Sequence, residues 1–227
     1  MKLTEAAGRQ VKLYGNPAAE TVIWMHTFSD EGEAAFAMLS PEMQAHAALA
    51  AIAMPNPEWN ALLSPWEAPA LFKKEPPFAG KADTYLHILT DSIMPETAAQ
   101  NGLSPRRNLI AGYSLAGLFA LYALYRTDRF SGAASISGSL WYPGFSSYLR
   151  EKSPIRKPDA VYLSLGDREC RTRNPLLASV QTQTEEIAAL FQASGIRTEY
   201  RLNPGGHTNQ AAERTAKALV WLIQSYN

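Results

Sequence analysis

Cysteine is almost absent from this chain of 227 residues, which has only Cys170. One cysteine forms no internal disulfide, and it excludes zinc sites that are built from several cysteines. An excess of charge of either sign is also lacking, because 21 Lys and Arg residues balance 21 Asp and Glu residues. This balance removes the electrostatic basis for binding nucleic acid or an anionic membrane, so we expect neither partner.

Long hydrophobic runs are missing as well. No segment reaches the roughly 18 apolar residues that a membrane-spanning helix requires, and the start of the chain is not followed by the apolar region of a signal peptide. There is no His-Glu-x-x-His stretch, no phosphate-binding loop with its lysine and no Gly-x-Gly-x-x-Gly after a strand, so we expect no metal and no cofactor. Together with the lone cysteine, these absences favour a cytoplasmic protein.

What the sequence does contain is typical of a folded protein, with 46% hydrophobic and 10% aromatic residues. Strand-like and helix-like segments alternate, which predicts an α/β fold with a mainly parallel central sheet and helices on both faces. The length fits a single domain over residues 1–227. We expect strands at residues 21–26, 49–54, 108–111, 133–137, 160–165 and 198–202, and helices at residues 82–99, 115–125, 175–194 and 209–224. Pro95 should kink or end the first of these helices.

Residues 55–80 interrupt this regular alternation. The segment holds six prolines together with Trp59 and Trp66. It is too long and too rich in proline for an ordinary connection, and loops of this length are commonly functional. Because its tryptophans favour packing, we expect an ordered loop that forms part of a pocket.

The sharpest local motif is Gly-Tyr-Ser-Leu-Ala-Gly at residues 112–117, between an expected strand and an expected apolar helix. This is the context of a nucleophile elbow, in which Ser114 is held at a tight turn and the residues two before and two after it must be small. Gly112 and Ala116 satisfy that requirement, although glycine is commoner at the second position. The competing interpretation is an ordinary glycine turn before a core helix.

A serine nucleophile needs a base, and the chain has four histidines. His207 follows the last expected strand in a glycine-rich loop, so it is the candidate base, with a solvated loop histidine as the alternative. His46 and His87 lie in an apolar run and in a helix, which favours structural roles. His26 ends the first expected strand, on the side where an oxyanion hole would lie.

An acidic residue usually orients such a base. Asp167 and Glu169 both follow the expected strand at 160–165, which ends at the same sheet edge as Ser114. Glu169 is longer and lies further into the loop, so we favour it and keep Asp167 as the alternative acid. Either choice gives the chain order Ser, acid, His of α/β-hydrolases. The competing interpretation is that both acids pair with nearby arginines on the surface.

An oxyanion hole needs two backbone N–H donors. We expect one from Leu115, directly after the nucleophile, and the other from Thr27 or Phe28, which follow the strand at 21–26. Aromatic side chains near the same edge are candidates for binding substrate. They are Trp141, Tyr142, Trp59 and Trp66. The alternative is that these rings only pack loops onto the body of the protein.

The chain resembles the putative-esterase branch of the α/β-hydrolases, which includes enterochelin-type siderophore esterases and esterase-D-like enzymes. The resemblance rests on residues 112–118 (GYSLAGL), 137–142 (SGSLWY), 164–169 (SLGDRE) and 204–207 (PGGH), and it extends from about residue 21 onward. It implies hydrolysis of carboxylic esters without a cofactor. It also points to Glu169 as the acid, since the strand-end motif Gly-x-x-acid supplies the carboxylate in that branch.

We therefore predict a serine esterase that acts on a small-molecule ester through Ser114, His207 and Glu169 and an acyl-enzyme intermediate. One alternative is an acyltransferase that uses the same triad with an alcohol or amine acceptor. Another is a binding protein that has kept the fold and lost the reaction. The natural ester does not follow from the sequence, and a homo-oligomer is compatible with it.

Overall fold

The computed structural model of the chain describes residues 1–28, 30–72 and 75–226. Its central feature is an eight-stranded sheet in the order β1-β2-β4-β3-β7-β8-β9-β10. The six strands from β4 to β10 pair in parallel, and β2 pairs antiparallel with both β1 and β4. The strands are β1 (Lys2–Ala6), β2 (Arg9–Gly15), β3 (Thr21–Thr27), β4 (Ala47–Ala53), β7 (Arg107–Tyr113), β8 (Gly132–Ile136), β9 (Ala160–Gly166) and β10 (Arg197–Asn203).

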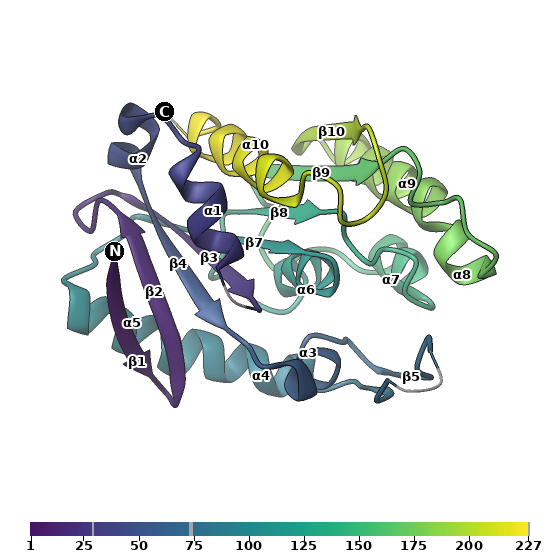
Figure 1. Ribbon diagram of the computed structural model, residues 1–227, viewed down its shortest axis with the longest axis horizontal. Helices are drawn as coiled ribbons and strands as arrows, with labels where there is room; N and C mark the ends of the chain where they lie inside the picture. Colours follow the sequence, from purple (N-terminus) through teal and green to yellow (C-terminus); the bar gives the residue numbers. More distant parts are fainter. Residues whose placement is uncertain (29, 73–74, 227) are drawn as a thin grey trace.

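Helices cover both faces of this sheet, which confirms the predicted α/β class. Figure 1 shows α1 (Glu31–Ala37) and α10 (Ala211–Gln224) together on one face, and α4 (Ala82–Ile88) and α5 (Met94–Asn101) along the other. The remaining helices are α2 (Pro41–His46), α3 (Asn56–Leu62), α6 (Leu115–Leu124), α7 (Phe145–Glu151), α8 (Pro175–Ala178) and α9 (Val180–Ala193). Among the described residues, no helix combines the length and the apolar character needed to cross a membrane.

Alternating side chains of the buried strands feed two separate cores. In β3, Val22 and Trp24 pack with α4, α5, α6 and α9, whereas Ile23 and Met25 pack with α1 and α10. Successive side chains of a strand point to opposite faces, so a strand that is covered on both sides is apolar throughout. This explains why all seven residues of β3 are buried.

Two helices differ from their predictions. Pro95 does not end the helix at 82–99: α4 continues through a π-helical turn at Leu89–Ile93 into α5, in which Pro95 occupies the first turn. Pro95 has no N–H to donate the backbone hydrogen bond that a continuous α-helix would form there. The π-helical turn before it changes the backbone hydrogen-bond pattern locally. The expected helix at 175–194 is divided into α8 and α9 at Ser179.

The proline-rich segment at 55–80 has structure of its own. It forms α3 and a small antiparallel pair, β5 (Glu67–Ala68) and β6 (Phe78–Ala79). The hydroxyl of Ser64 accepts a hydrogen bond from the Gly80 N–H at 3.0 Å, which joins the two ends of the pair. The segment is therefore a folded excursion beside the carboxyl end of the sheet.

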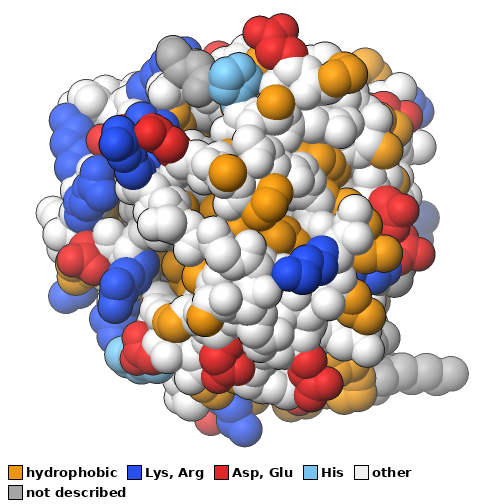
Figure 2. Space-filling view, turned by 90° about the vertical axis from the view of Figure 1, so that its left-hand side faces the viewer, with side chains coloured by type: hydrophobic (Ala, Val, Ile, Leu, Met, Phe, Trp, Pro, Cys, Tyr) orange, Lys and Arg blue, Asp and Glu red, His pale blue; other side chains and the backbone are white. Residues whose placement is uncertain are grey.

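Surface charges of both signs are mixed. Figure 2 shows Lys, Arg, Asp and Glu side chains interspersed with apolar ones over the face near β1 and β2. This pattern agrees with the equal numbers of acidic and basic residues.

Candidate active site

Ser114 lies at the tight turn between β7 and α6. Its backbone has φ +59° and ψ −124°, which is a strained conformation for a residue with a β-carbon. A β-carbon on Gly112 would lie 2.3 Å from the carbonyl oxygen of Ala116, so only glycine allows the strand and helix to approach this closely. The local sequence therefore folds as the elbow that the motif predicted.

Backbone hydrogen bonds extend past the ends of the strands and join the loops of the site. The Ser114 N–H donates to the Ile136 carbonyl at 3.0 Å, and the Ser139 N–H donates back to the Ser114 carbonyl at 3.0 Å. The Ser137 N–H donates to the Ser164 carbonyl at 2.8 Å. These bonds fix the turns after β7 and β8 against their neighbours.

The turn after β9 is joined in the same way to the loop after β10. The Asp167 N–H donates to the Asn203 carbonyl at 2.8 Å, and the Arg168 N–H donates to the Gly205 carbonyl at 3.0 Å. The Asp167 carboxylate accepts the Gly205 N–H at 2.8 Å. Asp167 thus holds the loop that precedes His207.

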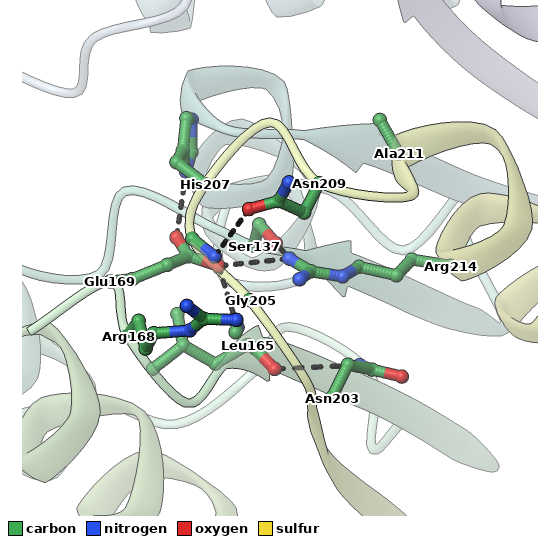
Figure 3. Close-up of polar contacts among 12 residues, drawn as sticks. Ser137, Leu165, Arg168, Glu169, Asn203, Gly205, His207, Asn209, Ala211 and Arg214 are labelled. Carbon is green, nitrogen blue, oxygen red and sulfur yellow. Dashed lines mark hydrogen bonds and ion pairs between the residues drawn. The ribbon is translucent and has the colours of Figure 1, made fainter.

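Three side chains from separate loops form a continuous hydrogen-bonded chain. Ser114 Oγ lies 3.0 Å from His207 Nε2, and His207 Nδ1 lies 2.7 Å from Glu169 Oε2. Figure 3 shows Glu169 and His207 from the turns after β9 and β10 pointing toward one another. Of the two acids considered from the sequence, the structure places Glu169 beside the base.

The surroundings of Glu169 keep its carboxylate ionised. The side chain is only 4% exposed, and burial acts to raise its pKa. The hydrogen bond and charge of His207 and the Gly166 N–H at 2.6 Å outweigh burial, so the pKa of Glu169 lies below its ordinary value. An ionised Glu169 accepts the Nδ1 proton of His207, which leaves Nε2 free to take a proton from Ser114.

The loop of His207 is fixed from both sides. The Tyr113 hydroxyl donates to the His207 carbonyl. The Asn209 side chain accepts the Gly206 N–H at 2.7 Å. Sequence reasoning missed both Tyr113 and Asn209, although Tyr113 directly precedes the candidate nucleophile in the elbow motif.

The other three histidines make no contact with Ser114 or Glu169, although His26 lines a cavity beside Ser114. His26 is fully buried, with Nε2 at 2.8 Å from the Tyr85 hydroxyl. Burial, reinforced by the nearby charge of Arg9, lowers its pKa to about 3, so it is neutral at physiological pH. His46 and His87 are exposed on α2 and α4, and neither is among the residues that line the cavities described next.

Two cavities meet at the candidate nucleophile, and both are lined by Trp59, Ser114 and His207. One, of about 380 Å³, lies toward the 55–80 segment, and we call it the loop-side cavity. The other, of about 410 Å³, lies toward the start of α10, and we call it the helix-side cavity. Their shared residues place the Ser114 side chain at the junction of the two cavities.

The expected oxyanion residues border these cavities. Leu115 lines the loop-side cavity and is the first residue of α6, where a backbone N–H has no acceptor within the helix. Thr27 and Phe28 line the helix-side cavity together with Ser114. The use of these N–H groups as oxyanion donors stays a prediction.

The four aromatic residues that were candidates for substrate binding divide into two pairs. Trp59 and Trp141 line the loop-side cavity, with Trp59 stacked on Phe28 at 3.8 Å between ring centroids. Trp66 and Tyr142 line neither cavity, so for them the structure supports the packing alternative. The Tyr142 hydroxyl donates to the Trp66 carbonyl at 2.6 Å, which fastens the 55–80 segment to the loop after β8.

Other apolar residues of the 55–80 segment were missed. Leu71, Phe72 and Phe78 line the loop-side cavity beside Trp59. Their signal was present in the sequence, because they are large apolar residues within a proline-rich segment that was expected to form part of a pocket. The lone Cys170 lies apart from the triad contacts, with Sγ at 3.4 Å from the Gln181 side-chain oxygen.

Comparisons with known proteins show the family and the fold of the chain. The sequence model of the family described as "Putative esterase" matches residues 18–213. Similar solved structures include a siderophore hydrolase, EstA, from Aspergillus nidulans (19% identity, 95% of this chain and 90% of that chain, TM-score 0.72). They also include an IroE-like serine hydrolase from Shewanella oneidensis (15%, 96% and 77%, TM-score 0.80) and the enterobactin esterase FES from Shigella flexneri (19%, 100% and 59%, TM-score 0.68). At these identities the structural likeness shows an α/β-hydrolase fold.

Proposed function

We propose that this chain, which belongs to the Putative esterase family, is a serine esterase that cleaves carboxylic esters through Ser114, His207 and Glu169. Family membership supports an enzyme that acts on esters. The observation that supports the named residues is the unbroken contact from Ser114 Oγ through the His207 ring to Glu169, with distances of 3.0 and 2.7 Å. A nucleophile, a base and an orienting acid in this arrangement are the parts that acyl transfer requires.

The proposed reaction begins when Ser114 Oγ attacks the ester carbonyl and its proton passes to His207 Nε2. Glu169 stabilises the imidazolium that forms, and the Leu115 N–H faces the oxyanion. Collapse of the tetrahedral intermediate breaks the ester bond, and His207 returns the proton to the leaving alcohol. Water then attacks the acyl-enzyme with His207 as base, which releases the acid and restores the Ser114 hydroxyl.

The two cavities support a substrate with bulk on both sides of the ester bond. The ester carbonyl at Ser114 would lie between spaces of about 380 and 410 Å³. The surface of both linings is mostly apolar, with Trp59 in both and Met25, Ala211 and Ala212 in the helix-side cavity. Such surfaces favour aryl or alkyl groups over sugars or free amino acids.

The test is intact-mass analysis after exposure to a fluorophosphonate, with peptide mapping of the adduct. We expect one adduct on the native protein and none on Ser114→Ala, which should also lose nearly all hydrolysis of p-nitrophenyl butyrate. Ser139→Ala is the matched control: its hydroxyl lies 3.4 Å from Ser114 Oγ, and labelling should persist.

Each contrary outcome has a distinct meaning. Continued labelling and turnover in Ser114→Ala would show that another residue is the nucleophile. Folded native protein that forms no adduct and hydrolyses no ester would favour a non-catalytic relative. Formation of a new ester in the presence of a competing alcohol, in place of free acid, would indicate an acyltransferase.

A further inference from the structure

Arg214 is a buried cation that the proposed reaction does not use. It lies in the first turn of α10, and only 1% of its side chain is exposed. A guanidinium buried to this extent is costly unless charged and polar partners replace its water. Its partners therefore indicate why the fold keeps a charge in this place.

The partners of Arg214 come from three loops of the site. Nη1 donates to Glu169 Oε1 at 3.2 Å and to Ser137 Oγ at 3.0 Å, and Nη2 donates to the Pro204 carbonyl at 3.0 Å. Figure 3 shows the guanidinium reaching from α10 toward Ser137 and Glu169. These partners follow β8, β9 and β10, so one side chain joins the turn of the acid to the loop of the base.

The two oxygens of Glu169 have separate partners. Oε2 contacts His207 Nδ1, whereas Oε1 accepts from the Gly166 N–H and from Arg214. A carboxylate that is held at Oε1 cannot rotate away from the imidazole. The approach of the arginine also depends on glycine, because a β-carbon on Gly166 would lie 2.9 Å from Arg214 Nη2.

We propose that Arg214 is the positioning residue of the Glu169–His207 pair. Its guanidinium fixes the carboxylate through Oε1 and, through the Pro204 carbonyl, anchors the loop that brings His207 to Ser114. Arg214 reaches neither Ser114 nor the two cavities, so it acts through its partners and not on the substrate. This inference rests on the proposed function, because it assigns His207 as the base.

The charge of Arg214 should change how readily the Glu169–His207 pair binds a proton, and a role in packing alone would not. A cation beside the pair disfavours uptake of a proton by either member, so its removal should make the pair bind a proton more readily. The other ionisable groups that interact with the pair are Tyr113, whose ring contacts His207, and Tyr200, which interacts electrostatically with Glu169. Asp167 and Arg168 lie in the same turn as Glu169, where Asp167 accepts the Gly205 N–H and pairs with Arg168. They are the same in every variant, so a difference between variants reports on residue 214.

The experiment compares Arg214→Met and Arg214→Gln, which lack the charge, with Arg214→Lys, which keeps it. For the uncharged variants we expect kcat/KM to fall about 100-fold, as for a misplacement of roughly 1 Å. The acidic limb of the kcat/KM profile should move up by about one pH unit. Arg214→Lys should restore the limb to its native midpoint but recover kcat only in part, because an ammonium cannot reproduce the guanidinium fork.

The proposal would be overturned if the acidic limb of the kcat/KM profile stayed at its native pH in folded Arg214→Met or Arg214→Gln. It would also be overturned if the loss of activity only matched the unfolded fraction measured by circular dichroism. If both uncharged variants fail to fold, Arg214→Lys decides: a native kcat would overturn the proposal, and a kcat about tenfold lower with unchanged KM would support it.

A measurement without substrate separates this inference from the proposed function. Titration of the His207 ring signals by NMR, assigned with His207→Asn, should show the same upward movement in Arg214→Met. Native protein that neither labels nor hydrolyses esters would refute the proposed function. An NMR midpoint that is identical in native protein and Arg214→Met would refute the role of Arg214.

Discussion

Replacement of Glu169 by Gln tests the triad most directly, because it keeps the shape of the side chain and removes its charge. Glu169 Oε2 lies 2.7 Å from His207 Nδ1. With about 4 Å between the charge centres and an effective dielectric constant of about 20, the attraction between carboxylate and imidazolium is about 4 kcal/mol. This attraction exists only after His207 has taken the Ser114 proton, so its loss raises the barrier and lowers kcat about 10³-fold. A Gln amide that turns its NH₂ toward Nδ1 also favours the wrong tautomer, which extends the loss toward about 10⁴-fold.

Asp167→Asn is the matched control, since it removes a carboxylate from the same turn. Asp167 accepts the Gly205 N–H at 2.8 Å, and an Asn oxygen can accept the same bond. We expect kcat within about twofold of the native value, the effect of a change of about 0.5 kcal/mol. The assay is steady-state hydrolysis of p-nitrophenyl butyrate at pH 8 by variants whose folding has been checked by circular dichroism. More than a tenth of the native kcat in Glu169→Gln, or an equal loss in Asp167→Asn, would contradict the role assigned to the Glu169 carboxylate.

Two further predictions concern stability. His26 has a folded pKa of about 3 against an ordinary value of 6.5, so the unfolded chain binds more protons and the stabilisation is lost as the pH falls below 6.5. Between pH 7.5 and pH 5, the free energy of unfolding in urea should fall by about 2 kcal/mol more for native protein than for His26→Phe. If the difference between the two proteins is the same at both pH values, His26 is not buried in its neutral form. Gly112→Ala should cost at least about 1–3 kcal/mol because its β-carbon would lie 2.3 Å from the Ala116 backbone. Gly206→Ala, with its nearest neighbour at 3.5 Å, is the control, and equal losses in thermal unfolding would refute the steric argument.

The sequence predicts the centre of the sheet better than its edge. Strands such as β9, which is mostly apolar and fully buried, stand out because they are covered on both faces. The β1–β2 hairpin was not predicted, because its strands are only partly buried and it turns at Ala7 and Gly8 with positive φ. The apolar residues Val11 and Leu13 alternate with polar ones in the sequence, and both are buried. The alternation covers too few residues to indicate a strand clearly.

Local sequence explains why the acid remained ambiguous. Asp167 and Glu169 lie in one turn, and both can reach the sheet edge. What separates them is contact with segments distant in the sequence: Gly205 engages the first carboxylate, and Arg214 and His207 engage the second. Long-range pairing of this kind does not follow from periodicity or spacing along one segment.

Arg214 shows how a functional side chain can hide within an amphipathic pattern. In α10, residues 214, 218 and 222 are all buried, and their spacing of four places them on one face of the helix. The spacing of buried residues along α10 assigns Arg214 to the core. Either that assignment of the buried face is wrong, or the arginine has a buried partner for its charge. The acidic turn after β9 ends at the same sheet edge and offers Asp167 and Glu169 as partners. The structure shows that the partner is Glu169, whose Oε1 lies 3.2 Å from Arg214 Nη1.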